Sequence, residues 1–274
     1  MTHNLALIGY PIDASLAPHI YTQFLAKHAI NGGYNAFSLP DQVELPVLLH
    51  FLERFGFTGL NISAPHKQAI IEHVQNVDDS VRKLGAANTL KLERDGWLAY
   101  NTETYGFAQL LDTHNMALDG EIIIMGAGSA ASAVLSVLQE RGIKHVSIAN
   151  RSEEHVKQLK ERSQIDISYF KYQSLREQLA FDIVINCSSA DWAHPLWLSH
   201  FWGEDGTIFG GHSPHTAIDL QYHNDDSGFL ARWESPRKVN GLAMLAAQAA
   251  KAFEIWFGVL PEYELSELIK EWKQ

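Results

Sequence analysis

Hydrophobic residues in the first hundred positions gather in short runs, and these runs alternate with longer amphipathic stretches. The runs that predict buried strands lie at 5–10, 34–39 and 59–63. Apolar residues at helical spacing predict helices from Pro18 to about Lys27 and over 41–55. Pro65 predicts the first turn of another helix. Because alternating strands and helices form βαβ units, we expect a mostly parallel sheet.

The segment 87–101 has a different pattern. Apolar and polar residues alternate on both sides of Arg94-Asp95-Gly96, and Asp-Gly is a strong signal for a tight turn. This part of the chain therefore predicts a β-hairpin.

A second series of strands and helices begins near Thr104. Apolar residues at 122–125 lead into a glycine turn and an alanine-rich helix, and further strands are predicted within 145–152 and 181–189. An apolar helix over 240–258 and a more polar one over 262–273 complete the chain. The pattern indicates an α/β protein with two domains.

Composition and charge limit the partners that we expect. The 274 residues carry a formal net charge of −11 and no long basic run, which argues against nucleic acid or an anionic membrane as the main partner. We see no signal peptide and no apolar run long enough to span a membrane, which favours a cytoplasmic protein. The single cysteine, Cys187, excludes an internal disulfide. We expect no metal site either, because Pro214 prevents a helix from aligning His212 with His215.

A glycine turn follows the strand at 122–125. Gly126-Ala127-Gly128-Ser129-Ala130-Ala131 fits the dinucleotide-binding pattern G-x-G-x-x-G/A, with a strand before it and a helix after it. Gly126 would permit the tight turn, and Gly128 would let a pyrophosphate approach the helix N-terminus. The alternative is a tight turn that binds nothing. We favour a Rossmann-like cofactor domain.

The end of the next strand helps to identify the cofactor. Asn150-Arg151-Ser152 stands where NAD-binding proteins usually have an acidic residue, about 20 residues after the glycines. Arginine can pair with a 2′-phosphate through two parallel hydrogen bonds, which favours NADP. Glu153 and Glu154 argue the other way, although acidic residues also stabilise a helix start.

Several polar residues in the first domain have ordinary explanations when each is taken alone. Ser63 and Asn101 are good turn formers, and Glu103 suits the start of a helix. Lys67 could be a solvated surface charge, although a lysine at the predicted helix start opposes the helix dipole. Asn88 follows Gly85-Ala86-Ala87 and has no distinctive setting of its own.

Taken together, these residues resemble the shikimate dehydrogenase family, and the matching motifs run in order along almost the whole chain. The motifs that carry the resemblance are Gly9-Tyr10-Pro11-Ile12-Asp13-Ala14-Ser15-Leu16-Ala17-Pro18, Asn61-Ile62-Ser63-Ala64-Pro65-His66-Lys67, Gly85-Ala86-Ala87-Asn88-Thr89, Asn101-Thr102-Glu103-Thr104-Tyr105-Gly106, the glycine turn, Asn150-Arg151-Ser152, Asn186-Cys187-Ser188-Ser189, Asp219 with Tyr222, and Gly241 through Gln248.

The resemblance implies an NADP-dependent dehydrogenase that reduces 3-dehydroshikimate to shikimate in aromatic amino-acid (chorismate) biosynthesis. Lys67 would be the acid/base, and Glu103 its carboxylate partner. Ser15 would bind the substrate carboxylate. The other implied substrate-binding residues are Ser63, Asn88, Tyr222 and Gln248. The implied cofactor-binding residues are Gly126, Ala127, Gly128, Ser129, Ala130, Asn150, Arg151, Ser152, Ser188 and Gly241.

The implied architecture is an α/β fold in which a Rossmann-like NADP domain, 104–239, is inserted into a smaller substrate domain with a mostly parallel sheet. That smaller domain would comprise 1–103 and 240–274. The partner would be a small cyclic hydroxy acid, and the protein would be a monomer or a homodimer.

Four departures from the family motifs lie in or beside the expected substrate site. Glu103 replaces the usual aspartate, Ser63 replaces a threonine, Ala17 replaces a serine and Ala14 replaces a histidine. Two other functions therefore stay open. One is a paralogue that acts on quinate or another cyclic hydroxy acid, and the other is a weakly catalytic NADP-binding regulatory protein.

Overall fold

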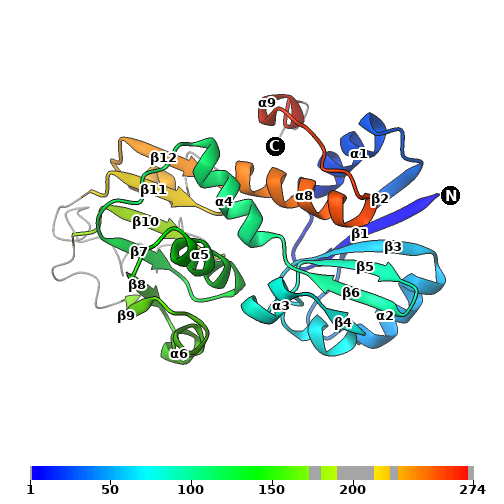
Figure 1. Ribbon diagram of the computed structural model, residues 1–274, viewed down its shortest axis with the longest axis horizontal. Helices are drawn as coiled ribbons and strands as arrows, with labels where there is room; N and C mark the ends of the chain where they lie inside the picture. Colours follow the sequence, from blue (N-terminus) through cyan, green and yellow to red (C-terminus); the bar gives the residue numbers. More distant parts are fainter. Residues whose placement is uncertain (1, 173–179, 190–212, 223–227, 271–274) are drawn as a thin grey trace. The chain divides into compact units, whose positions relative to one another are not determined.

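The computed structural model describes residues 2–172, 180–189, 213–222 and 228–270 (Figure 1). The chain divides into two compact units of nearly equal length. Unit 1 comprises Met1–Gly106 and Leu245–Gln274, and unit 2 comprises Phe107–Met244. The divisions fall inside helix α4 (Glu103–Thr113) and helix α8 (Leu242–Phe257), a few residues from the predicted boundaries.

Unit 1 is built on a six-stranded sheet in the order β2-β1-β3-β5-β6-β4. Its strands are β1 (His3–Gly9), β2 (Gly32–Ser38), β3 (Phe57–Ile62), β4 (Asn76–Val77), β5 (Thr89–Glu93) and β6 (Gly96–Tyr100). Strand β1 pairs in parallel with both β2 and β3, as the βαβ pattern predicted. The predicted hairpin is confirmed as β5 and β6, with Glu93 opposite Gly96. Gly96 has a φ of +115°, which suits glycine at this turn.

The helices of unit 1 bury their apolar faces against this sheet. Helix α2 (Leu45–Arg54) places its buried leucines against a cluster that includes Ile8 and Leu60. The ring of Trp256 on α8 lies near Tyr21 of α1 (Ala17–Lys27), 5.1 Å between centroids. A Cβ on Gly59 would come within 2.6 Å of the Trp256 indole nitrogen, so this close approach requires glycine.

The predicted helix at Pro65 is wrong. Residues 64–68 form turns, and only a 3-10 helix, η1 (Ala69–His73), follows; short helix α3 (Asp79–Leu84) comes later. The turn is closed locally, because the backbone N–H of His66 donates to the carbonyl of Ser63 at 3.1 Å. Lys67 therefore precedes η1 instead of opening an α-helix, so its charge does not oppose the dipole of an α-helix.

Unit 2 is an all-parallel six-stranded sheet in the order β12-β11-β10-β7-β8-β9. Its strands are β7 (Ile122–Met125), β8 (His145–Asn150), β9 (Asp166–Lys171), β10 (Ile183–Asn186), β11 (Thr216–Asp219) and β12 (Arg237–Asn240). Read from the other edge, this is the doubly wound order 3-2-1-4-5-6. The Rossmann-like prediction is confirmed. Helix α5 (Ser129–Glu140) covers the sheet (Figure 1), and α6 (Glu153–Arg162) follows β8.

Three strands of unit 2 were not predicted. Strand β12 has the sequence RKVN, and β9 and β11 mix polar with apolar residues, so none forms a continuous apolar run. At the C-terminus the described part of the predicted helix 262–273 is only α9 (Leu265–Leu268), and residues 271–273 lie outside the described part. Among the described residues, no helix has the length and apolar character that crossing a membrane requires.

Candidate active site

Lys67 and Glu103 form an ion pair inside unit 1. The distance from Lys67 Nζ to Glu103 Oε1 is 2.6 Å. The Glu103 side chain is only 3% exposed, whereas that of Lys67 is 21% exposed, so the amine end of the pair is the more accessible one. Glu103 is the first residue of α4, and side chains at a helix start lean toward its N-terminus. The 2.6 Å distance shows that the additional methylene of glutamate does not prevent the predicted contact.

Asn88 lies at the centre of a buried hydrogen-bond network. Its Oδ1 accepts from the backbone N–H of Thr102 at 2.9 Å, which fixes the orientation of the amide. Its Nδ2 donates to Thr102 Oγ1 at 3.0 Å and to Gln248 Oε1 at 3.2 Å. The fold thus brings together two predicted substrate-binding residues, Asn88 of the hairpin and Gln248 of α8.

Ser15 and Ser63 follow the carboxyl ends of the neighbouring parallel strands β1 and β3. The Ser15 hydroxyl oxygen accepts from the backbone N–H of Ala17 at 3.2 Å, and its own proton can still be donated to a carboxylate. The two strand exits are tied together, because the N–H of Tyr10 donates to the carbonyl of Ala64 at 2.8 Å. Tyr222 is half-buried after β11 in unit 2, and so belongs to the other unit.

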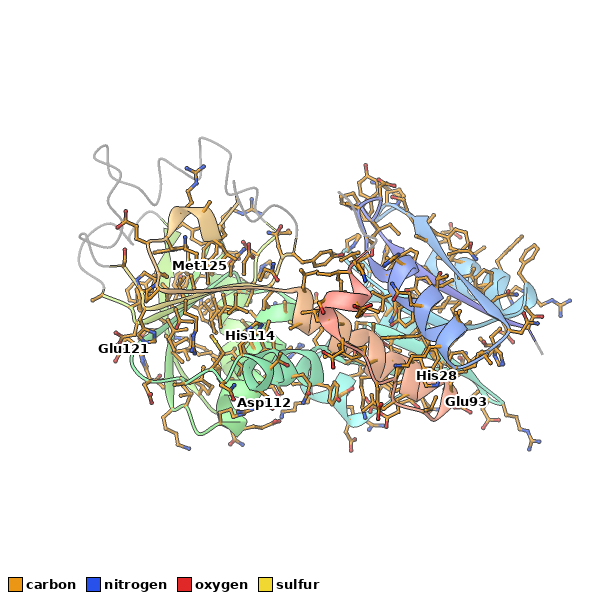
Figure 2. The ribbon with its side chains drawn as sticks, turned by 90° about the horizontal axis from the view of Figure 1, so that it is seen from above. His28, Glu93, Asp112, His114, Glu121 and Met125 are labelled. Atoms are coloured by element: carbon orange, nitrogen blue, oxygen red, sulfur yellow. The ribbon has the colours of Figure 1, made fainter. Side chains whose placement is uncertain are left out.

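The predicted cofactor residues of unit 2 gather at one edge of its sheet. Met125, labelled in Figure 2, ends β7, and the N–H of Gly126 then donates to the carbonyl of Ala149 on β8 at 2.8 Å. On the other side of β7, Ser188 follows β10, and its Cβ would lie 3.1 Å from a Cβ on Gly126. Strand order reverses between β7 and β10, which is where doubly wound proteins bind their ligands.

The glycine turn fits a dinucleotide. Gly126 has a φ of +103°, a conformation that favours glycine. Gly128 caps α5 without any side-chain hydrogen bond to the first turn, and a Cβ placed there would meet no atom of the described residues within 4 Å. Free space beside the uncapped N-terminus of a twelve-residue helix suits a pyrophosphate. Ala127, Ser129 and Ala130 are partly exposed around this point, whereas Ala131 is fully buried, as close helix–sheet packing requires.

Arg151, the predicted partner of a 2′-phosphate, lies at the carboxyl end of β8. Arg151 comes directly after β8 and is exposed. The neighbouring Asn150 is held in place, because its Nδ2 donates to the carbonyl of Ser152 at 2.8 Å. Burial raises the pKa of Tyr172 above its usual range, and the positive charge of nearby Arg151 opposes that rise. The arginine therefore supplies a cation at the carboxyl edge of the sheet, where a 2′-phosphate would need one.

Ser188 and Gly241 have structural roles as well. The Ser188 hydroxyl donates to Asn186 Oδ1 at 2.7 Å, which closes the turn after β10. A Cβ on Gly241, between β12 and α8, would lie 2.1 Å from the carbonyl oxygen of Leu220, so any larger residue would collide with the backbone that follows β11. Their predicted contact with the cofactor is a separate matter and stays a prediction.

Comparison with known proteins gives a consistent result along the chain. Residues 7–90 match the shikimate dehydrogenase substrate binding domain, residues 111–194 the family described as shikimate / quinate 5-dehydrogenase, and residues 241–265 the shikimate 5'-dehydrogenase C-terminal domain. A shikimate dehydrogenase (NADP(+)) from Caldicellulosiruptor saccharolyticus is 33% identical over 275 residues, covering 98% of each chain.

The chain belongs to the shikimate dehydrogenase family.

Other members of the shikimate dehydrogenase family agree with this assignment. A shikimate dehydrogenase (NADP(+)) from Hyphomonas neptunium is 33% identical, over 96% of this chain and 94% of that protein. The crystal structure of shikimate 5-dehydrogenase from Thermus thermophilus, in complex with NADP(H) and shikimate, has a TM-score of 0.79 and 27% identity. The matched region spans 98% of this chain and 97% of the Thermus thermophilus chain. The predicted family and fold class are confirmed.

Asn101 and Thr102 were not among the site residues that the sequence predicted for this shikimate dehydrogenase family member. Asn101 and Thr102 are both buried, and each bonds a predicted site residue: Asn101 bonds Glu103, and Thr102 bonds Asn88. Their position between Asn88 and Glu103 in the motifs was the available signal. No group of three metal-binding side chains occurs in the described residues, and His212 lies outside them.

Proposed function

We propose that this protein is an NADP-dependent shikimate dehydrogenase that catalyses the reversible reduction of 3-dehydroshikimate to shikimate, a step of aromatic amino-acid biosynthesis. The observation that carries the proposal is the 2.6 Å contact between Lys67 and Glu103. An accessible amine beside a buried carboxylate is suited to move a proton at a hydroxyl or carbonyl oxygen. The curated relatives with this reaction in their names support the choice of substrate.

Lys67 and Glu103 have different roles at the reacting oxygen: Lys67 transfers the proton, and Glu103 positions Lys67. NADP(H), bound at the carboxyl edge of the unit 2 sheet, would supply the hydride in reduction and accept it in oxidation. During reduction, Lys67 Nζ donates a proton to the carbonyl oxygen as that oxygen becomes a hydroxyl; in oxidation it takes the proton back. Glu103 balances the positive charge and holds the amine in place.

The polar side chains around the pair would hold the ring. The Ser15 hydroxyl can donate to the substrate carboxylate. Asn88 Nδ2 donates a hydrogen bond to Gln248 Oε1 at 3.2 Å. A ring hydroxyl of the substrate would either displace this hydrogen bond or add a further one to the same two side chains. Several fixed donors and acceptors around a polyhydroxylated ring provide orientation and specificity.

The deciding assay follows NADPH absorbance with purified protein, NADP⁺ and either shikimate or quinate. We expect shikimate to be oxidised with the higher kcat/KM, and NADP⁺ to be preferred over NAD⁺. If only quinate is turned over, the substrate of the protein is quinate or a related cyclic acid, and not shikimate. If neither acid reacts while NADPH still binds, the protein has lost this catalysis and the proposal is wrong.

A paralogue that acts on another cyclic hydroxy acid is the second candidate. The observation in its favour is Ala17, whose methyl group is buried at the start of α1, where the family motif has a second serine. With this hydroxyl missing, Ser15 is left as the one serine of the motif at this turn to hold a carboxylate. The quinate arm of the assay tests this candidate directly.

Arg151 should set the preference for NADP over NAD. We expect Arg151→Ala to raise KM for NADP⁺ about ten- to a hundredfold, because charge-assisted hydrogen bonds to the 2′-phosphate are lost. KM for NAD⁺, which lacks this phosphate, should change little. Steady-state kinetics with both cofactors measure the effect, and Arg94→Ala, at the hairpin turn of unit 1, is the matched control. An equal rise for both cofactors would place the 2′-phosphate elsewhere.

A further inference from the structure

We infer that Asn101 is a positioning residue, which sets the Glu103 carboxylate against Lys67. The inference rests on the proposed function, and the contacts that carry it lie within unit 1. Asn101 is only 6% exposed, although asparagine is normally a surface residue. A buried amide of this kind is stable only when its donors and acceptor are all used.

The acceptor of the amide holds the backbone of Glu103. Asn101 Oδ1 accepts from the backbone N–H of Glu103 at 2.8 Å. Glu103 opens α4, and the first N–H groups of a helix have no partner within the helix. This bond satisfies one of them, and it leaves no ambiguity about which end of the amide is oxygen.

The donors of the amide reach the side chain of Glu103 and a neighbouring peptide. Asn101 Nδ2 donates to the carbonyl of Ala86 at 2.8 Å and lies 3.5 Å from Glu103 Oε2. Lys67 bonds the other carboxylate oxygen, Oε1. Each oxygen of Glu103 therefore has its own donor, so the plane of the carboxylate is fixed.

The same peptide group also holds Lys67. The N–H of Ala87 donates to the backbone carbonyl of Lys67 at 2.8 Å, and the carbonyl of Ala86 belongs to the same planar unit. One rigid peptide thus anchors the lysine backbone on one side and, through Asn101, the carboxylate on the other. Ser80 Oγ fixes Asn101 in turn, by accepting from its backbone N–H at 2.8 Å.

This arrangement bears directly on the glutamate of this chain. A glutamate has one more rotatable bond than the aspartate of the family motif, and so has more conformations in which it would miss Lys67. The buried amide of Asn101 removes that freedom. Asn101 touches no reacting atom and acts through Glu103.

The test is a double-mutant cycle between Asn101→Ser and Glu103→Ala. Serine can still accept from the N–H of Glu103, but it lacks the amide that donates to Ala86 and Glu103. We expect Asn101→Ser alone to lower kcat for shikimate oxidation by at least about tenfold, with KM for NADP⁺ unchanged. In the Glu103→Ala background it should change kcat by less than about twofold, because the group through which it acts is gone.

Gln75→Ala is the matched control, because Gln75 Oε1 accepts from the backbone N–H of Trp97 on the same hairpin, a bond that does not involve Glu103. It should leave kcat unchanged. If Asn101→Ser lowers kcat equally with and without Glu103, or if Gln75→Ala lowers it as much, Asn101 is merely structural and the inference is wrong.

A second arm needs no substrate. Urea unfolding midpoints of wild type, the two single variants and the double variant should be non-additive if Asn101 bonds the Glu103 side chain, and additive if it does not. Suppose that wild type fails to oxidise shikimate while the midpoints remain non-additive. The proposed function is then wrong, but Asn101 still positions Glu103. Additive midpoints would overturn the inference whatever the activity.

Discussion

Replacing Lys67 with alanine should lower kcat for shikimate oxidation by about a hundred- to ten-thousandfold, the usual contribution of a general acid–base group. The variant has no proton acceptor at the hydroxyl, and Glu103, with a side chain 3% exposed, loses its counter-ion. A buried charge without its partner is costly, so we also expect a lower melting temperature. The Kd for NADP⁺ should stay within about twofold, because the predicted cofactor residues belong to unit 2.

Lys91→Ala is the control for this variant. Lys91 lies in the same unit and pairs with Glu93 at 3.0 Å, but both side chains are substantially exposed. Loss of such a surface pair costs about 0–1 kcal/mol. Stopped-flow and steady-state rates should be normal for Lys91→Ala. An unaltered kcat in Lys67→Ala would remove Lys67 from the mechanism, whereas a weakened affinity for NADP⁺ would mean that the fold had been damaged.

Gly128→Val should separate cofactor binding from folding. The φ of Gly128 is −91°, which valine readily adopts, and a Cβ there meets no atom of the described residues within 4 Å. The melting temperature should therefore change little. The valine side chain would occupy the space predicted for the pyrophosphate, so we expect KM for NADP⁺ to rise at least about a hundredfold.

Gly33→Val provides the matched comparison, because a Cβ on Gly33 also meets no described atom within 4 Å, but this residue is on β2, in unit 1. It should keep both the melting temperature and KM for NADP⁺. If Gly128→Val binds NADP⁺ as tightly as wild type in a fluorescence titration, the dinucleotide does not approach α5 through this glycine.

Much of the fold could be predicted because its strands are short apolar runs. Strand β7 matches the predicted run 122–125, and Glu103 is the helix-start acid that its residue type indicated. The helix at Pro65 failed because proline at a first helical position is permissive but does not nucleate a helix. Strand β12 was missed because only Val239 of RKVN is buried, so its place depends on pairing with β11.

The candidate site was predictable in its chemistry but not in its connections. Lys67 and Glu103 were paired through the family motifs, and nothing in their separation along the chain required a 2.6 Å contact. The role of Asn101 was hidden because two of the groups that its amide bonds, the N–H of Glu103 and the carbonyl of Ala86, are backbone groups. Ala86 and Ala87 contribute a carbonyl and an N–H, and every residue except proline has both.

The points at which the chain passes between its two units have a consequence for how such proteins can evolve. Both passages lie within helices, after Gly106 in α4 and before Leu245 in α8, and Glu103 and Gln248 are each within four residues of one of them. A recombination event that exchanged unit 2 for another nucleotide-binding domain would have to cut these helices beside the residues that we assign to the chemistry and to the substrate. Modular exchange is therefore hindered, and a new substrate is more easily reached by point substitutions, which leave both helices intact.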